Sequence, residues 1–212
     1  MRTSRCTTFA AVLAVLCGAW IFAPATHAVN TIPMNVSDLI RESDQIVVGT
    51  VSAVNSGFQK NQLPYTEVVV NVSESIRGNG EKTLTFRQFG LPSAQPAKDG
   101  RRYVGLVAGM PQYKPGEHVV LFLSRSSSIG YRSTIGLGQG KFSLRGGNLE
   151  NEFNNAGLFQ NLKMAATALD EKESRLVQTE QGAVGAEAFL GFVRRAVSEK
   201  WFTVKTPKGV TQ

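Results

Sequence analysis

After residue 28 the chain has no cysteine and one histidine, His118, so the residue types that support most side-chain chemistry are scarce. Cys6, Cys17 and His27 all lie within the first 28 residues. Catalytic zinc normally needs three protein ligands, mostly His or Cys, and a disulfide needs two cysteines. The residues after position 28 therefore supply no thiol nucleophile, no disulfide and no Cys/His metal cluster.

Glu117 and His118 place a carboxylate next to a base in the sequence. Adjacent residues of a strand point to opposite faces of a sheet, and a serine hydrolase also needs a positioned serine and an oxyanion hole. The chain has no Gly-x-Ser-x-Gly elbow that would expose a serine nucleophile. We therefore expect His118 to be a structural strand residue, with a His-dependent hydrolase as the weaker alternative.

Some carboxylate and glycine residues could form other kinds of functional site. Glu67 and Glu74 could act as a glycosidase pair, but nothing in their spacing selects them over solvated strand residues. Glu150-Asn151-Glu152 is too short for a calcium loop. The glycine-rich residues 136–140 precede a strand-like segment and not a helix, which predicts a bend and not a nucleotide loop. We predict no catalytic residue, no cofactor-binding residue, no cofactor and no metal ligand.

The first 28 residues have the order of a secretion signal peptide. Arg2 and Arg5 form a basic start, an apolar run covers residues 9–23, and small residues allow cleavage after Ala25 or Ala28. The apolar run is too short to cross about 30 Å of hydrocarbon comfortably. We expect an exported protein, periplasmic or secreted, whose mature form has no stable membrane span.

The basic balance of the chain is modest. The formal net charge is +7, and removal of Arg2 and Arg5 with the signal leaves 7 − 2 = +5. A nucleic-acid protein usually gathers its basic residues on one face with stacking aromatics, whereas here they are scattered. We expect no nucleic-acid partner, and at most weak contact with anionic surfaces.

Residues 29–157 carry the pattern of a β domain. A short helix over 37–43, with Ser37 able to cap it, precedes the first strand, and Gly49 within that strand indicates a bulge or a corner. The seven expected strands cover residues 45–54, 65–76, 83–89, 103–107, 118–123, 131–135 and 141–144. Their number and spacing predict a small OB-like antiparallel β-barrel, closed or partly closed, in an α+β protein that is mainly β.

Residues 158–212 are expected to be a helical C-terminal extension. Leu158, Leu162, Ala165 and Leu169 are spaced for one helical face, and a polar linker is expected near 170–186. A second apolar stripe follows at helical spacing, formed by Phe189, Phe192, Val193, Ala196 and Val197. This stripe predicts a helix packed on the barrel, and the alternative is a helix that binds a partner or a membrane surface.

The most apolar segment, residues 118–123, is expected to be a strand buried on both faces. We expect Val119, Leu121 and Leu123 to lie inside the barrel, against Ile46 or Val48 and Phe86. If the helix that carries Phe192 is peripheral, Leu121→Ala should destabilise the fold more than Phe192→Ala.

Two segments resemble netrin-like, tissue-inhibitor-type OB barrels: Ser43-Asp44-Gln45-Ile46-Val47-Val48-Gly49-Thr50-Val51 and residues 66–78, ending Ile76-Arg77-Gly78. The chain is more closely similar to a group of uncharacterised exported bacterial proteins, some of which carry such a module beside matrixin-type metalloprotease domains. That similarity rests on Gly109-Met110-Pro111, Lys114-Pro115-Gly116-Glu117, residues 119–123 and residues 136–142. It covers residues 36–144.

The resemblance implies an OB-type barrel but no mechanism. Tissue inhibitors of metalloproteases chelate zinc through an N-terminal cysteine, which this chain lacks after its signal, and no His-Glu-x-x-His motif makes it a matrixin. We expect an exported, non-enzymatic β-barrel module that binds an exported protein or an envelope component. The alternatives are a protease-associated regulator or inhibitor without a zinc-chelating N-terminus, and a carboxylate- or His-dependent hydrolase.

Overall fold

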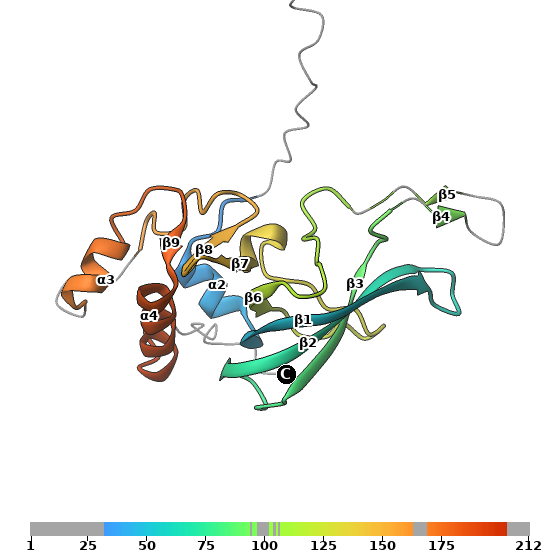
Figure 1. Cartoon of the computed structure of the whole chain (residues 1–212), viewed down its shortest axis with the longest axis horizontal. Helices are drawn as coiled ribbons and strands as arrows, with labels where there is room; N and C mark the ends of the chain where they lie inside the picture. The colour runs from blue at the N-terminus through green and yellow to red at the C-terminus, as the bar shows by residue number, and fades with distance from the viewer. Residues whose placement is uncertain are drawn as a thin grey trace, which may run out of the picture. The chain divides into compact units, whose positions relative to one another are not determined.

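The computed structural model describes residues 32–93, 95–96, 102–103, 105, 107–162 and 169–202, which belong to one compact unit, Thr31–Gln212. The expected signal peptide, residues 1–28, lies outside the described residues. Seven strands form one antiparallel sheet in the order β3-β2-β1-β6-β7-β8-β9, and β4 pairs with β5 separately (Figure 1). The protein is therefore mainly β within the α+β class, as the sequence predicts.

The bounds of the elements follow. The strands are β1 Gln45–Phe58, β2 Pro64–Arg77, β3 Thr83–Phe89, β4 Gln95–Pro96, β5 Arg102–Tyr103, β6 His118–Leu123, β7 Lys141–Arg145, β8 Asn148–Asn151 and β9 Val184–Gly185. The helices are α2 Val36–Glu42, α3 Glu171–Leu176 and α4 Ala186–Ser198, and a 3₁₀ turn, η1, covers Leu137–Gly140.

The two long strands, β1 and β2, pair along almost their whole length and are bulged. The register shifts between Val48 and Gly49, so the bulge expected at Gly49 is confirmed. A Cβ atom at this position would lie 2.4 Å from the carbonyl oxygen of Asn71. Glycine is needed here because the β2 backbone approaches too closely for any side chain.

The central strand β6 divides the core into two clusters. Val119, Leu121 and Leu123 face one cluster, and Val120 and Phe122 face the other. All five side chains are buried, so the prediction that this apolar strand is covered on both faces is confirmed.

The cluster around Leu121 contains Phe86, as the sequence predicts, together with Val51, Val68 and Val70. The expected contact with Ile46 or Val48 is wrong. Both residues pack in the opposite cluster, because they alternate along β1 with Val47, which faces Leu121.

A closed barrel is not confirmed, because the sheet is open between β3 and β9. Residues 131–135, expected to form a strand, make one isolated bridge, Thr134 with Leu123. The same segment nevertheless reaches the outer edge of β3, where the backbone N–H of Arg132 donates to the carbonyl of Arg87 at 2.8 Å.

Two boundaries differ from expectation. The first helix is capped by Asn35 and not by Ser37, since the Asn35 side chain accepts from the backbone N–H of Asp38. Ser37 instead lies buried within α2. Strand β1 continues to Phe58 because residues 55–58 pair with β2, which moves the turn to residues 59–63.

The C-terminal helix α4 packs on the sheet, as expected, but it is not peripheral. Phe189, Phe192, Val193 and Ala196 are all buried, in the same cluster as Phe142 of β7. Residues on both sides of position 157 thus share one core.

The segments before α4 correct two expectations. Leu158 and Leu162 lie in a turn region and not on a helix, and Ala165 is outside the described residues. The stretch near 170–186 is not a linker, because it forms α3 and β9, which bury Leu176 and Val184.

Candidate functional site

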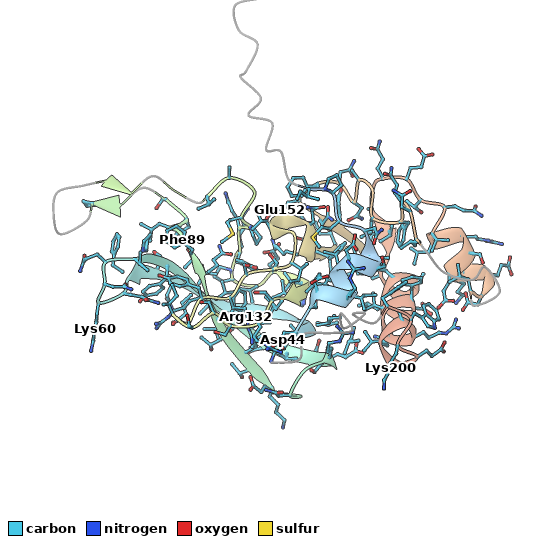
Figure 2. All side chains as sticks on the ribbon, turned by 180° about the vertical axis from the view of Figure 1, so that it is seen from behind. Asp44, Lys60, Phe89, Arg132, Glu152 and Lys200 are labelled. Carbon is cyan, nitrogen blue, oxygen red and sulfur yellow. The ribbon has the colours of Figure 1, made fainter. Side chains whose placement is uncertain are left out.

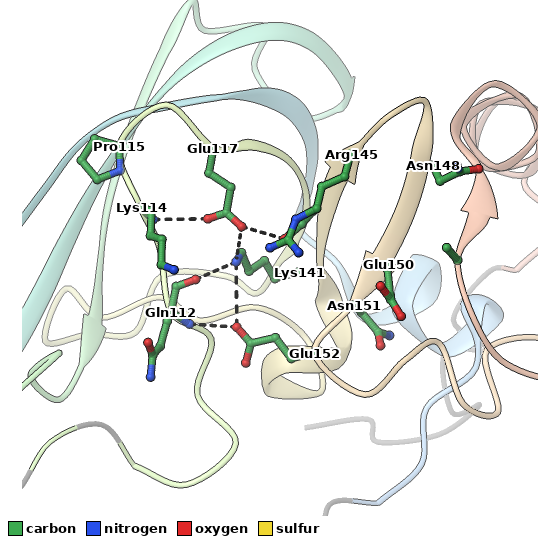
Figure 3. Close-up of a pocket in the computed structure, with 12 residues that line it drawn as sticks. Gln112, Lys114, Pro115, Glu117, Lys141, Arg145, Asn148, Glu150, Asn151 and Glu152 are labelled. Carbon is green, nitrogen blue, oxygen red and sulfur yellow. Dashed lines mark hydrogen bonds and ion pairs between the residues drawn. The ribbon is translucent and has the colours of Figure 1, made fainter.

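A pocket of about 630 Å³ opens between the loop before β6 and the β7–β8 hairpin (Figure 3). We call it the Lys141 pocket. It is lined by Gln112, Lys114, Pro115, Glu117, Lys141, Ser143, Arg145, Asn148, Glu150, Asn151, Glu152 and Ala183. Its volume falls within the range of about 300–1,000 Å³ that is usual for small-ligand sites.

Two glycine-containing bends place the charged residues of this pocket. Gly116 adopts a φ of 84° in the turn before β6, and the backbone N–H of Glu117 closes that turn on the carbonyl of Lys114 at 3.1 Å. Gly140 ends the bend before Lys141, where a Cβ atom would lie 2.3 Å from the carbonyl oxygen of Ile135. The glycine-rich segment is therefore a tight bend between strands, as its sequence context predicts.

The Lys141 ammonium is the centre of a hydrogen-bond network. Its Nζ donates to the carbonyl of Gln112 at 2.6 Å and to Oε1 of Glu117 at 2.7 Å, and it lies 3.9 Å from Oε1 of Glu152. The Lys141 side chain is 5% exposed. A charge buried to this degree is tolerated only where it is paired and hydrogen-bonded, and the three oxygens supply those partners.

The two carboxylates are held by further donors. The hydroxyl of Ser143 donates to Oε1 of Glu117 at 2.6 Å, and the backbone N–H of Lys114 donates to Oε2 at 3.2 Å. The backbone N–H of Gln112 donates to Oε1 of Glu152 at 2.9 Å. The network thus ties the 112–117 loop to β7 and to the end of β8.

The pKa values of the two carboxyl groups shift in opposite directions. Burial raises the pKa of Glu117, but hydrogen bonds from Lys141 and Ser143, together with the Lys141 charge, outweigh it and hold this pKa below its ordinary value. Burial raises the pKa of Glu152, and the Gln112 hydrogen bond and Lys141 offset this only in part.

The network around Lys141 is better suited to binding a charged ligand than to proton transfer. The hydroxyl of Ser143 has a carboxylate of lowered pKa as its acceptor, whereas a general base works best with a pKa near the operating pH. The Lys141 ammonium is engaged by its oxygen neighbours. The network therefore favours a preformed binding surface over nucleophilic catalysis.

The structure separates Glu117 from His118. Glu117 lines the Lys141 pocket, whereas His118 is exposed and its Nδ1 lies 2.9 Å from the hydroxyl of Thr50 on β1. The expectation that neighbouring strand residues face opposite ways holds for this pair.

Glu67 and Glu74 are not brought together either. They lie seven residues apart on β2, which spans about 20 Å of strand, whereas glycosidase carboxyl groups lie within about 10 Å of each other. Glu67 pairs with Arg87 at 2.8 Å, and Glu74 pairs with Arg194 of α4 at 2.6 Å.

Glu150, Asn151 and Glu152 all line the Lys141 pocket, which the sequence did not indicate. Within the described part of the chain, no group of three or more His, Cys, Asp or Glu side chains could hold a metal ion. Sequence reasoning also missed Lys141 itself. The local sequence gives no signal for it, because its place opposite Leu121 follows from the register of β6 and β7.

Comparisons of the chain with protein-family models, with curated proteins and with solved structures find no match. The resemblance to netrin-like modules of exported bacterial proteins therefore stays a prediction. Among the helices of the described residues, none has the length and apolar character needed to cross a membrane.

The lowered pKa of Glu117 predicts an acid-dependent loss of stability. A carboxylate whose folded-state pKa is depressed stabilises the fold above its unfolded-state value of 4.5, and that stabilisation disappears as the pH falls through the lower folded-state pKa. Glu117→Gln should therefore be less stable than wild type at pH 7, and the difference should shrink below pH 4.5. Urea unfolding at neutral and acid pH measures this difference.

Glu152→Gln is the matched control for this prediction. Because the folded state raises the pKa of Glu152, its ionised form opposes folding near neutral pH, and this opposition fades as the pH falls. The stability of Glu152→Gln relative to wild type should therefore be greater at pH 7 than in acid. If the stability of both variants relative to wild type changed with pH in the same direction, the opposite pKa shifts of Glu117 and Glu152 would be contradicted.

Proposed function

We propose that the mature chain is an exported, non-enzymatic binding module and that the Lys141 pocket holds its ligand. The observation that carries this proposal is the contrast between the centre and the rim of the pocket. At the centre, Lys141, Glu117 and Ser143 satisfy one another. At the rim, Lys114, Arg145, Asn148 and Glu150 are exposed. The side chains at the centre are held in place by one another, and the exposed side chains of the rim can contact a ligand. This arrangement suits a binding site that does not carry out a reaction.

The charges of the rim define the ligand class. Lys114 and Arg145 offer cations and Glu150 offers an anion, so a ligand with both signs of charge complements the rim. A short peptide segment with acidic and basic side chains, presented by an exported partner protein, meets this requirement. The amide of Asn148 adds a neutral donor and acceptor.

We also propose that the described sheet belongs to an OB-like barrel with one weakly paired seam. The segment 131–135 supports this, because it links β6 to β3. The backbone N–H of Ser124 donates to the carbonyl of Ser133 at 2.9 Å, and that of Arg132 donates to the carbonyl of Arg87 at 2.8 Å. The resulting order, β1-β2-β3, then this segment, then β6 back to β1, is that of a small five-stranded barrel, a scaffold that commonly presents binding loops.

The binding proposal is tested by chemical-shift titration of the isotope-labelled mature chain. The probes are two short peptides of equal length, one with alternating Lys and Glu and one with Ser throughout. The mixed-charge peptide should shift signals of the 112–117 loop and the β7–β8 hairpin, and the Ser peptide should not. The double variant Arg145→Ala/Glu150→Ala should lose the response, because both residues are exposed and belong to the rim.

Other results of this experiment would overturn the proposal. Equal responses to both peptides, or shifts away from the Lys141 pocket, would contradict the site. Cleavage of the peptide that Ser143→Ala abolishes would establish the hydrolase alternative. A zinc metalloprotease that is inhibited by the chain, with no response to either peptide, would establish the protease regulator instead.

A further inference from the structure

A second hollow, of about 550 Å³, lies at the turn between β1 and β2. We call it the Tyr65 hollow. It is lined by Phe58, Gln59, Lys60, Asn61, Tyr65 and Arg87. Figure 2 shows Lys60 at the end of the described unit that lies away from Lys200, two residues after the end of α4.

Further apolar side chains lie beside the residues that line this hollow. Phe89 stands opposite Tyr65 in the β2–β3 register and is 41% exposed. Ile129 is 55% exposed, and its carbonyl accepts from the Gln59 side chain at 3.4 Å. Tyr131 fixes the position of Phe89, since their ring centroids lie 5.9 Å apart. Exposed apolar side chains gathered around a hollow are typical of an interaction site.

The charge of the hollow is positive. Lys60 and Arg87 line it, and none of the lining residues is acidic. Arg87 is held in place by Glu67, which accepts from its Nε at 2.8 Å, and its guanidinium lies 4.5 Å from the centroid of the Tyr65 ring. Within the described region, neither Nη group of Arg87 makes a hydrogen bond and Lys60 has no ion pair. Lys60 can therefore pair with an anion of the ligand, and the Nη groups of Arg87 can donate to that anion while its Nε stays paired with Glu67.

The main chain around the hollow is already paired, which disfavours a peptide strand as the ligand. The backbone N–H of Gln59 donates to the carbonyl of Leu63 at 2.9 Å, and the carbonyl of Pro64 accepts from the backbone N–H of Gly90 at 3.2 Å. The carbonyl of Arg87 is taken by Arg132. A peptide would find few backbone partners for strand addition, so the ligand must be recognised by side chains.

We propose that the Tyr65 hollow binds an acidic oligosaccharide, with its carboxylates on Lys60 and Arg87 and its sugar rings against the aromatic side chains. The side-chain amides of Gln59 and Asn61 can serve its hydroxyl groups, because an amide offers both donors and acceptors. The carboxylates of such a ligand pair with the cations, and the apolar faces of its sugar rings contact the half-buried rings of Phe58 and Tyr65 and the exposed ring of Phe89. Such polymers are envelope or matrix components that an exported protein would meet.

Isothermal titration calorimetry of the mature chain tests this proposal. The probes are oligogalacturonate and oligomannuronate, their methyl esters, which keep the rings and lose the charge, and oligoglutamate as an acidic peptide. At least one uronate should bind, its methyl ester should bind about fivefold more weakly or worse, and added salt should weaken the uronate. Oligoglutamate should bind more weakly than the uronate.

The variants separate this site from other basic surfaces. Lys60→Gln lies in an exposed turn and should lower the affinity about two- to fivefold, as the loss of one exposed charge pair does. Tyr65→Ala should lower it about tenfold or more, because truncation of an aromatic anchor has a large effect. Lys172→Gln on α3, 77% exposed, is the matched control and should leave the affinity unchanged.

Four results would overturn the proposal: no binding of either uronate, equal affinity for the methyl ester, tighter binding of oligoglutamate, or an unchanged affinity in Lys60→Gln. The Arg145→Ala/Glu150→Ala variant should bind the uronate as wild type does. This variant distinguishes the two proposals, so peptide binding at the Lys141 pocket can be disproved without disproving oligosaccharide binding at the Tyr65 hollow.

Discussion

Phe192→Ala is expected to lower the free energy of unfolding by about 3–5 kcal/mol, the usual cost of truncating a buried phenylalanine. Phe192 is fully buried in the cluster that joins α4 to the sheet. Its ring lies 6.4 Å from that of Phe159 and 5.6 Å from that of Trp201, measured between centroids. Alanine would remove these contacts and leave a cavity between elements distant in sequence. Denaturant titration measures the loss.

Phe89→Ala is the matched control, because this phenylalanine is 41% exposed at the end of β3 and should cost under about 1 kcal/mol. Leu121→Ala, in the other cluster, should cost about 2–5 kcal/mol. Because Phe192 is buried as fully as Leu121, the condition for a smaller cost at Phe192, a peripheral helix, is not met. A Phe192→Ala protein as stable as wild type would show that α4 does not pack on the sheet in solution.

Local hydrophobic patterns predict which segments form helices and strands. They do not predict how deeply each of these elements is buried in the core. Residues 119–123, after His118, are all apolar, and burial of β6 on both faces follows directly from that composition. The stripe at Phe189 and Phe192 predicts α4 and its inner face, but not the ring of Phe142 that lies 4.9 Å from Phe189. Burial at the centre of the core depends on the facing element, which periodicity within one helix does not contain.

The predictions of a closed barrel and of a linker before α4 fail for the same physical reason. Strand propensity indicates that residues 131–135 are extended, but whether they complete a ladder depends on β3, far away in the sequence. Leu176 and Val184 are two of a few apolar residues in a mostly polar stretch, and these few residues form no sustained helix or strand period. Their burial arises from tertiary contacts that turn an expected linker into α3 and β9.

The candidate site was the least predictable part of the chain. Sequence reasoning weighed Glu117 with its neighbour His118, whereas the partner of Glu117 in the fold is Lys141, which the strand pairing of β6 and β7 brings close. A lysine is almost never buried unless it is paired. The pairing joins residues from separate bends, so neither local sequence indicates it.

Lys141→Met is expected to be the most damaging change at the site. Methionine keeps much of the side-chain length but removes the ammonium, so the Glu117 carboxylate loses its cation while Glu152 remains nearby. Breaking a fully buried pair costs about 3–5 kcal/mol, and we expect about 2–4 kcal/mol here because the Glu117 side chain keeps 15% exposure. Urea unfolding at pH 7 measures the cost.

The double variant Lys141→Met/Glu117→Gln shows whether the cost comes from the unpaired charge. Replacing both partners removes the stranded carboxylate, and neutral replacements of buried ion pairs are often tolerated. The double variant should therefore be no less stable than Lys141→Met alone, and the mutant cycle should give a coupling energy above about 1 kcal/mol. If the two single costs simply add, Lys141 acts through its packing over the Tyr113 ring, 5.4 Å from Nζ to the centroid, and not through the carboxylate.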